Sequence, residues 1–336
     1  MTGKTCPIVT LTPAPTLDRT YFVKNLVEGG VNRADRVGEE LAGKGINVSR
    51  GLHLAGIPAP GIVPIGNADP GVLERTGSGF LTPLWIEGTL RVSTTVVEYD
   101  GPTTKINEHP RPLKQQDWDA VVDLTEKTVL ENKAEWLVIA GAHPEIVETG
   151  QVIPLQPLFD RMDAIGVKVV LDTSGPALRY WAERGNAAVM KPNAHELAEC
   201  VGKDLKTIGD VIDAARILNS WGVNCVMASL GVDGIIAVTK SHAIHAYTPP
   251  VKVINTVGAG DSTIAGFLSA VTAHPSEPEA FGVGFNVAEG IAAAVQWGAA
   301  KVQQPTSGLQ SIDNLVEATV ELIPDRDRFL GEPATA

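Results

Sequence analysis

The chain has 336 residues, of which 44% are hydrophobic and 20% are charged, so it can bury a large core and falls within the size range of single α/β domains. Its net charge of −12 argues against sequence-independent binding to nucleic acid. Cys6, Cys200 and Cys225 form no CxxC pair, which argues against a zinc site or a disulfide framework and for a reducing compartment. The sequence shows no signal-peptide pattern and no apolar run of membrane-spanning length, so we expect a cytoplasmic protein.

Apolar runs of strand length alternate with longer amphipathic stretches along most of the chain, which predicts a mainly parallel α/β sheet. The expected central strands are Pro7–Leu11, Trp136–Ala140, Val167–Asp172, Ala188–Lys191, Asn224–Ser229 and Gly234–Thr239. The expected helices are Asp117–Asn132, Leu155–Ile165, His195–Val201 and Thr207–Trp221. No repeat or linker divides the sequence, so we expect one domain over residues 1–325 and a loose C-terminal tail over residues 326–336.

Two segments interrupt this alternation and predict short β-hairpins. Their strand-like runs are Tyr21–Leu26, Val31–Val37, Ser93–Tyr99 and Thr103–Asn107. A glycine turn joins the first two runs, and Asp100-Gly101 joins the last two. One interpretation is a pair of ordinary surface hairpins. The other is a small β-sheet lid, formed by about residues 16–38 and 91–108, that shields a reaction site from water.

The run Gly258-Ala259-Gly260-Asp261 stands directly before a helical stretch at Thr263–Ala270. Glycine permits a tight turn there, and the unpaired amide groups at a helix start form a site for phosphate oxygens. A carboxylate beside such a site suits phosphate transfer to a hydroxyl, because the acid accepts the proton while the amides hold the developing charge. The alternative is an N-capped turn in which Asp261 itself accepts the free amides.

A second glycine-rich stretch contains Gly43-Lys44-Gly45-Ile46-Asn47. Gly38 and Lys44 have the spacing of a Walker A loop, but Gly45 occupies the position where that loop requires Ser or Thr, so we reject a P-loop. Glycines beside an Asn and a Lys at a helix start fit a polyhydroxy ligand instead. The alternative is a glycine-rich helix start that binds no ligand.

Together, the two stretches resemble the two signatures of the ribokinase-like sugar kinases, also called the phosphofructokinase B family, and the resemblance covers roughly residues 7–322. Within the family, the runs at Pro15–Thr20, Gly29–Ala34 and Thr104–Glu108 look most like those of 1-phosphofructokinases and the related tagatose-6-phosphate kinases. The resemblance implies a three-layer α/β/α core with a β-sheet lid. It also implies a kinase that uses ATP and Mg²⁺ to phosphorylate a sugar phosphate, with fructose 1-phosphate as the favoured acceptor.

The resemblance further implies roles for individual residues. Asp261 matches the catalytic base, and the amides of Gly258, Ala259 and Gly260 match the anion hole. The positions that match substrate contacts are Asp18, Arg33, Gly43, Lys44, Asn47, Arg91 and Lys105. The positions that match the nucleotide site are Lys191, Asn193, Ser229, Gly231 and Gly234, with Asp172 and Glu196 near Mg²⁺.

Some of these roles have ordinary structural alternatives. Arg91, at the base of a hairpin, could be a solvated surface residue, and Glu196 could be a helix carboxylate near an N-cap. His143 and His195 have no partner motif, and we assign them no role. The run Ala142–Ile146 departs from the family pattern, because it lacks a serine and gains Glu145, which weakens the case for fructose 1-phosphate.

Three functions stay open at this point: a sugar-phosphate kinase, a kinase for an uncharged sugar or a nucleoside, and a non-catalytic ligand sensor with the same fold. Fructose 6-phosphate and tagatose 6-phosphate are the alternative phosphorylated acceptors. The expected partners are the sugar phosphate and ATP, with neither nucleic acid nor membrane. A lid sheet has exposed edges, so a homodimer through the lid is possible.

Overall fold

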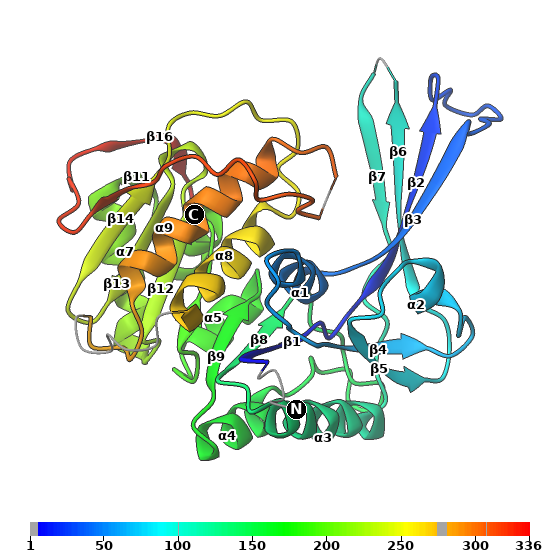
Figure 1. Cartoon of the computed structure of the whole chain (residues 1–336), viewed down its shortest axis with the longest axis horizontal. Coiled ribbons are helices and arrows are strands. Elements are labelled where there is room, and N and C mark those ends of the chain that lie inside the picture. The colour runs from blue at the N-terminus through cyan, green and yellow to red at the C-terminus, as the bar shows by residue number, and fades with distance from the viewer. Residues whose placement is uncertain (1–5, 100, 274–280, 307) are drawn as a thin grey trace.

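A computed structural model describes residues 6–99, 101–273, 281–306 and 308–336, and its centre is a ten-stranded sheet (Figure 1). The order across the sheet is β15-β14-β13-β12-β10-β9-β8-β1-β4-β5, parallel from β12 to β5 and antiparallel from β15 to β12. The strands are β1 (Ile8–Leu11), β4 (Gly61–Gly66), β5 (Leu81–Ile86), β8 (Trp136–Ala140), β9 (Lys168–Asp172), β10 (Val189–Met190), β12 (Cys225–Ser229), β13 (Ile235–Thr239), β14 (Ala243–Tyr247) and β15 (Thr319–Glu321).

Helices cover both faces of this sheet, and each face buries its own apolar cluster. One layer consists of α1 (Lys44–Leu54), α8 (Ala259–Ala273) and α9 (Val287–Val302). The other consists of α3 (Gln115–Asn132), α4 (Gln156–Ala164), α5 (Pro176–Ala182), α6 (Ala194–Val201) and α7 (Ile208–Trp221). Central parallel strands are mostly apolar because both of their faces are buried. The predicted three-layer α/β/α fold with a mainly parallel sheet is confirmed.

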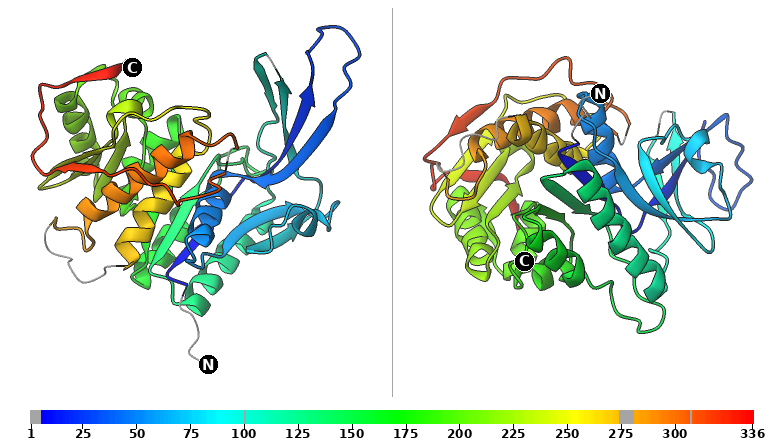
Figure 2. Two further views of the ribbon diagram at one scale, coloured as in Figure 1. Left: turned by 45° about the horizontal axis from the view of Figure 1, so that its top comes forward. Right: turned by 60° about the horizontal axis from the view of Figure 1, so that its bottom comes forward.

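A second, four-stranded sheet stands away from the main body (Figure 2). Its order is β3-β2-β6-β7, with β2 and β6 parallel at its centre, and its strands are β2 (Thr16–Val23), β3 (Arg36–Ala42), β6 (Arg91–Glu98) and β7 (Thr103–Asn107). We call this sheet the lid sheet. A small apolar cluster that includes Leu17, Leu41 and Ile46 anchors its base beside the short helix α2 (Val72–Arg75).

The lid strands begin and end at different residues from those predicted. β2 starts at Thr16 rather than Tyr21, and β3 runs from Arg36 to Ala42 rather than over residues 31–37. Both strands extend into the lid base, where runs such as Asp18-Arg19-Thr20 and Gly38-Glu39-Glu40 interrupt the alternation of apolar and polar residues that predicts a strand. β7 has the predicted bounds, and Asp100 of the predicted turn lies outside the described residues.

The C-terminal tail is not loose, so this prediction was wrong. Residues Phe329–Ala334 form β16, which pairs antiparallel with β11 (Leu205–Thr207) and buries Leu330 and Ala334. The backbone amide of Gly331 also donates to the Asp233 carboxylate at 2.7 Å, in the 3₁₀ turn η1 (Gly231–Asp233). A polar segment that gains its order from such distant partners leaves little periodic signal in its own sequence.

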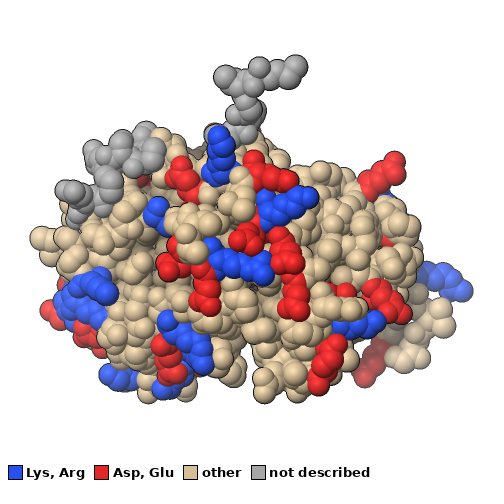
Figure 3. All heavy atoms as spheres, turned by 90° about the horizontal axis from the view of Figure 1, so that it is seen from below, with Lys and Arg blue, Asp and Glu red and all other residues tan. Residues whose placement is uncertain are grey.

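Lys and Arg side chains are interspersed with Asp and Glu on the face seen in Figure 3. Arg161 of α4, for example, pairs with Asp123 and Glu126 of α3 at 2.7 and 2.8 Å. Among the described helices, none has the length and apolar character needed to cross a membrane.

Candidate active site

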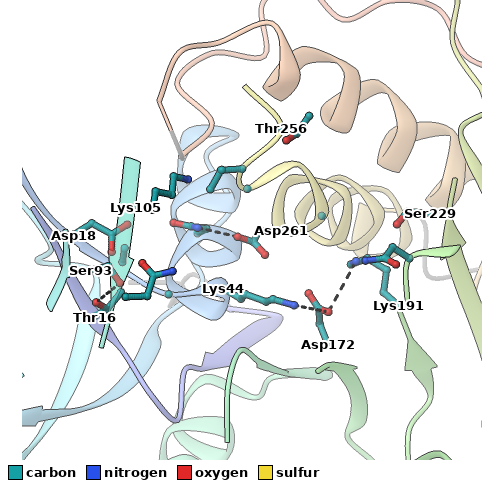
Figure 4. A pocket seen from close by; sticks show the side chains of 18 of the residues that line it. Thr16, Asp18, Lys44, Ser93, Lys105, Asp172, Lys191, Ser229, Thr256 and Asp261 are labelled. Carbon is teal, nitrogen blue, oxygen red and sulfur yellow. Dashed lines mark hydrogen bonds and ion pairs between the residues drawn. The ribbon is translucent and has the colours of Figure 1, made fainter. Parts of the chain in front are cut away.

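A cavity of about 650 Å³ lies between the lid sheet and the carboxyl ends of the parallel strands, with helices α1 and α8 at its floor (Figure 4). Open parallel sheets commonly bind ligands at this edge. The cavity is lined by Thr16, Asp18, Ala42, Gly43, Lys44, Asn47, Ser93, Thr95, Lys105, Asn107, Asp172, Lys191, Asn193, Glu196, Ser229, Gly231, Thr256, Val257, Gly258, Gly260 and Asp261. The two glycine-rich stretches of the sequence therefore meet in one place.

Asp261 is the third residue of α8 and faces the cavity, where it is 5% exposed. Its Oδ2 accepts a hydrogen bond from Asn47 Nδ2 of α1 at 2.8 Å. This geometry does not match the N-cap alternative, because an N-cap residue precedes the helix and bonds its backbone amides. Burial raises the pKa of Asp261 to about 6, and the Asp172 carboxylate adds to the rise, while Asn47, Lys44 and Lys191 oppose it.

Gly258 and Gly260 line the cavity at the start of α8, but Ala259 does not. The Ala259 amide donates to the Thr256 carbonyl at 3.2 Å, which engages one of the three amides expected in the anion hole. A side chain at Gly260 would come 3.0 Å from Lys191 Nζ. The turn therefore places backbone next to a cation, as an anion site requires.

The start of α1 comes unusually close to β1, and this approach requires glycine. A Cβ at Gly43 would lie 2.5 Å from the Thr12 side chain, and one at Gly45 would lie 2.8 Å from the Leu11 carbonyl oxygen. Gly43 also has a φ of 148°, which favours glycine. The close approach lets Lys44 project from the first turn of α1 into the cavity (Figure 4), and Asn47 of the same turn also lines it.

Lys44, Asp172 and Lys191 form a charged group on the core side of the cavity. Asp172 Oδ1 lies 3.1 Å from Lys44 Nζ and 3.9 Å from Lys191 Nζ. Burial alone would lower the pKa of Lys44, but the carboxylates of Asp172 and Asp261 outweigh it and the net shift is upward. Two ammonium groups around one carboxylate give this group of three side chains a net positive charge, which favours an anionic ligand beside it.

The nucleotide-site candidates Asn193, Glu196, Ser229 and Gly231 lie together at the far end of the cavity. Asn193 and Glu196 form a capping box at the start of α6, with two reciprocal side-chain to backbone hydrogen bonds of 2.8 Å. Glu196 thus caps the helix and also lines the cavity, so its capping role does not replace the predicted role near Mg²⁺. Gly234 does not line the cavity.

Gly234 has a structural reason to be glycine, because a Cβ there would lie 2.1 Å from the Ala246 carbonyl oxygen. Its φ of 84° points to the same requirement.

One face of the lid sheet supplies the remaining polar lining. Asp18 pairs in register with Ser93, Ser93 with Asn107, and Thr95 with Lys105. Side chains alternate between the faces of a strand, so these residues project to the same side, toward the cavity. Burial raises the pKa of Asp18 to about 6, with Glu40 adding to the rise and Lys105 opposing it.

Several lining residues had no predicted role, namely Thr16, Ala42, Ser93, Thr95, Asn107, Thr256 and Val257. A signal for the strand residues exists in the period of two that connects them to Asp18 and Lys105. It could be used only once the strand register was known.

Arg33 and Arg91 do not line the cavity, in contrast to the expected substrate contacts. Arg33 is exposed in the segment between β2 and β3. The Arg91 guanidinium donates to three backbone carbonyls, of Ala14, Pro15 and Glu108, at 2.9 to 3.3 Å. Arg91 thereby stabilises the base of the lid sheet. These three hydrogen bonds account for an arginine at this position even if it binds no phosphate.

The departing run Ala142–Ile146 follows β8 and lies behind Lys44. Glu145 is exposed and forms a β-bridge with Val152, so its charge is not directed into the cavity lining. Both ring nitrogens of His143 are buried without a hydrogen-bond partner among the described residues. Burial, and then the charge of Lys44, lower the pKa of His143 to about 4, so this ring is neutral at physiological pH.

Comparison with known proteins agrees with the resemblance inferred from the sequence. Residues 14–314 match the model of the pfkB family carbohydrate kinases. The chain is 32% identical over 287 residues to a 1-phosphofructokinase of Haloferax volcanii, covering 82% of this chain and 88% of that protein. It is 31% identical over 300 residues to the ATP-dependent 6-phosphofructokinase isozyme 2 of Escherichia coli, covering 87% and 93%.

The fold is also similar to that of a solved relative. The crystal structure of phosphofructokinase-2 from Escherichia coli in complex with fructose-6-phosphate superposes with a TM-score of 0.73 at 28% identity, covering 89% of this chain and 94% of that one. The family match spans both glycine-rich stretches, the lid sheet and the cavity between them. The chain therefore belongs to the pfkB family of carbohydrate kinases, which are phosphotransferases with a sugar alcohol group as acceptor.

Proposed function

We propose that the protein transfers the γ-phosphate of ATP to a hydroxyl of fructose 1-phosphate and so makes fructose 1,6-bisphosphate. The observation that carries this proposal is the position of Asp261, a cavity-facing carboxylate in the first turn of α8, beside Gly258 and Gly260 and hydrogen-bonded to Asn47. A carboxylate and a glycine-built turn in one cavity provide a proton acceptor and an anion site within reach of the same ligand.

In the proposed reaction, the sugar lies between the lid sheet and Asn47, with its acceptor hydroxyl directed at Asp261. Asp261 takes the proton as charge builds on the attacking oxygen, since a carboxylate with a pKa of about 6 is a weak base for an alcohol. The amides of Gly258 and Gly260, together with Lys191, stabilise the charge on the transferred group. Lys44 holds Asp172 in place and adds to the positive potential.

Asp172 and Glu196 fit a Mg²⁺ ion that accompanies ATP. Asp172 Oδ2 is buried and has no hydrogen-bond partner among the described residues, so it is open to a cation or a water. Two carboxylates are enough protein ligands for Mg²⁺, since it commonly binds through one or two carboxylates together with phosphate and water. When bound, the ion neutralises phosphate charge.

The names of the relatives favour fructose 1-phosphate. Lys105, a lid cation on the cavity, favours a phosphorylated acceptor over an uncharged one. Fructose 6-phosphate is the second candidate, because a relative at similar identity is named a 6-phosphofructokinase. Tagatose 6-phosphate and free sugars or nucleosides remain further candidates. A non-catalytic sensor is disfavoured, since it has no need of the Asp261 arrangement.

The proposal is tested by measuring ATP-dependent transfer to fructose 1-phosphate, fructose 6-phosphate, tagatose 6-phosphate and the free sugars. We expect the highest kcat/KM with fructose 1-phosphate and at least a tenfold lower value with free fructose. A higher kcat/KM with another phosphorylated hexose reassigns the acceptor. No transfer to any sugar above background contradicts the proposed function.

The lid also suggests a partner, namely a second copy of the chain. β3 and β7 are the edge strands of the lid sheet, and large apolar side chains on and beside it are exposed, including Val37 at 50% and Ile106 at 64%. We propose a homodimer that pairs through this sheet. Light scattering after size exclusion tests it, with Ile106→Glu expected to shift the dimer to monomer and a monomeric wild type contradicting the pairing.

We also place the enzyme in the cytoplasm in this proposal. Cys200 and Cys225 are buried thiols that form no disulfide, which fits a reducing compartment.

A further inference from the structure

Lys301 is a lysine in the last turn of α9 whose side chain is fully buried. Its Nζ donates to the backbone carbonyl of Asn255 at 3.2 Å. Placing an ammonium group in a protein interior costs several kcal/mol unless nearby groups compensate its charge. An apolar side chain could fill the same space at no such cost, so a buried lysine here calls for a reason beyond packing.

The end of α9 holds the segment that leads into the phosphate-binding turn. The amides of Ile254 and Asn255 both donate to the Val302 carbonyl, at 2.7 and 3.1 Å. One turn before Lys301, Gly298 packs against the first turn of α8, where a Cβ would lie 3.2 Å from Thr263 Oγ1 and 4.0 Å from the Ala259 carbonyl oxygen. Residues three apart share a helix face, so Lys301 lies behind the same turn.

Asn255 connects Lys301 to the cavity. Its side-chain oxygen accepts from the Val257 amide at 3.0 Å, and its side-chain nitrogen donates to the Pro305 carbonyl at 2.9 Å. These bonds fix the peptide between Asn255 and Thr256, whose carbonyl faces Lys301. The N–H of a trans peptide is antiparallel to its C=O, so the Thr256 amide is directed away from Lys301, and Thr256 lines the cavity.

Electrostatic coupling extends from Lys301 to the reaction site. Burial lowers the pKa of Lys301, and the Asp261 carboxylate opposes that change. A buried cation and a buried carboxylate therefore stabilise each other's ionised forms across the turn that begins α8. Screening by solvent is weak for a pair of this kind.

We propose that Lys301 is a positioning residue that acts as an internal cation behind the anion site, where it orients the Ile254–Gly258 segment and adds positive potential at the transferred phosphoryl group. The inference rests on the proposed function.

The position of Lys301 also bears on whether the enzyme requires a monovalent cation. Because the ammonium group already occupies the site next to the Asn255 carbonyl, the enzyme needs no monovalent metal ion for turnover. Truncation of the side chain would open a buried space with a carbonyl directed into it, which suits a small cation.

The test compares wild type, Lys301→Met and Lys301→Ala, with Lys203→Ala, an exposed lysine after α6, as the control. Turnover is measured with tetramethylammonium as the sole monovalent cation and then with added K⁺, NH₄⁺ or methylammonium. We expect wild type and Lys203→Ala to change less than about twofold on addition. Both Lys301 variants should lose about 100-fold in kcat, the scale of a lost anion-site donor. Lys301→Ala should regain at least tenfold with a small cation, and Lys301→Met, which fills the space, should not.

A kcat within threefold of wild type in Lys301→Met, a loss in Lys301→Ala that no cation restores, or a wild type that requires K⁺ overturns the inference. Should Lys301→Met fail to fold, Lys301→Gln takes its place.

A second measurement, the affinity for a non-hydrolysable ATP analogue by calorimetry, does not depend on which sugar is the acceptor. We expect affinity to fall at least tenfold in the variants and to recover with NH₄⁺ in Lys301→Ala, whereas unchanged affinity contradicts the role of Lys301. A wild type that binds the analogue in this way but phosphorylates no sugar refutes the proposed function alone.

Discussion

The core side and the lid side of the cavity are built in different ways. On the core side, Asp172, Lys191 and Asp261 are 1%, 4% and 5% exposed, and packed strands and helices hold them. On the lid side, Lys105 and Asn107 are exposed on an edge strand of a four-stranded sheet. Groups that stabilise developing charge act best when they are pre-organised and shielded from water, whereas groups that choose between ligands need only reach them. We therefore assign chemistry to the core side and acceptor selection to the lid side.

The largest effect should follow from a change on the core side. Lys191→Met removes the ammonium group beside Gly260 and should lower kcat by about 10²–10³-fold if, as we propose, that charge stabilises the transferred phosphoryl group. Steady-state kinetics with ATP and fructose 1-phosphate provide the measurement, and Lys203→Met serves as the exposed control. A kcat within threefold of wild type would remove Lys191 from the chemistry.

A change on the lid side should affect binding rather than turnover. Lys105→Met should raise KM for the phosphorylated sugar about tenfold or more, because a hydrogen bond between charged groups contributes about 1.5–3 kcal/mol, and should leave kcat nearly unchanged. Arg33→Met, outside the cavity, is the matched control and should change neither constant. If KM for free fructose rises by the same factor, Lys105 does not recognise a phosphate.

Asn47 of α1 donates a hydrogen bond to Asp261, and its removal should appear in the pH profile. That bond opposes the rise in the pKa of Asp261 to about 6. Asn47→Ala should therefore raise this pKa further, so the base is protonated over a wider acid range. The acid limb of kcat/KM should move to higher pH, with a several-fold loss near pH 6.5 that diminishes above pH 8. An unmoved limb would show that Asn47 does not stabilise the carboxylate.

The smallest effect should come from Asp233, which does not line the cavity but stabilises the turn that contains Gly231. Its carboxylate accepts from the Gly331 amide at 2.7 Å and lies 3.3 Å from an Arg328 nitrogen. Asp233→Asn should raise KM for ATP about threefold to tenfold, the effect of weakening hydrogen bonds worth about 1 kcal/mol. KM for the sugar should stay constant, and a change confined to the sugar would contradict this role.

The parts of the fold that could be predicted are those with a local signal. β8 has the predicted bounds because Trp136–Ala140 is a continuous buried apolar run, and α7 ends at Gly222 as glycine after a periodic helix predicts. Helix α9 was not predicted, because its alanine- and glycine-rich sequence gives little contrast between its faces. β16 depends on pairing with β11, more than 120 residues earlier in the chain, and no local pattern carries that information.

The candidate site shows the same division. Asp261, Asn47 and Lys44 could be found from the sequence because they lie next to glycines. Those glycines are required where the backbone comes close to neighbouring atoms, so they are visible in the sequence. Arg91 could not be placed, since the sequence does not reveal that three carbonyls occupy its guanidinium. Lys301 gave no signal either, because a lysine in the last turn of a helix ordinarily needs no explanation beyond the helix dipole.

The central claim concerns the carboxylate of residue 261, and Asp261→Asn tests it most directly. Its folded-state pKa of about 6 lies above the ordinary value of 3.8, so the contribution of Asp261 to stability falls as the pH rises from 3.8 to about 6 and stays low above that. The neutral variant should therefore be no less stable than wild type at pH 8. With stability and ATP-analogue affinity retained, we predict that turnover with fructose 1-phosphate at pH 8 falls at least about 100-fold, the scale of a lost general base. Turnover within threefold of wild type would contradict the account.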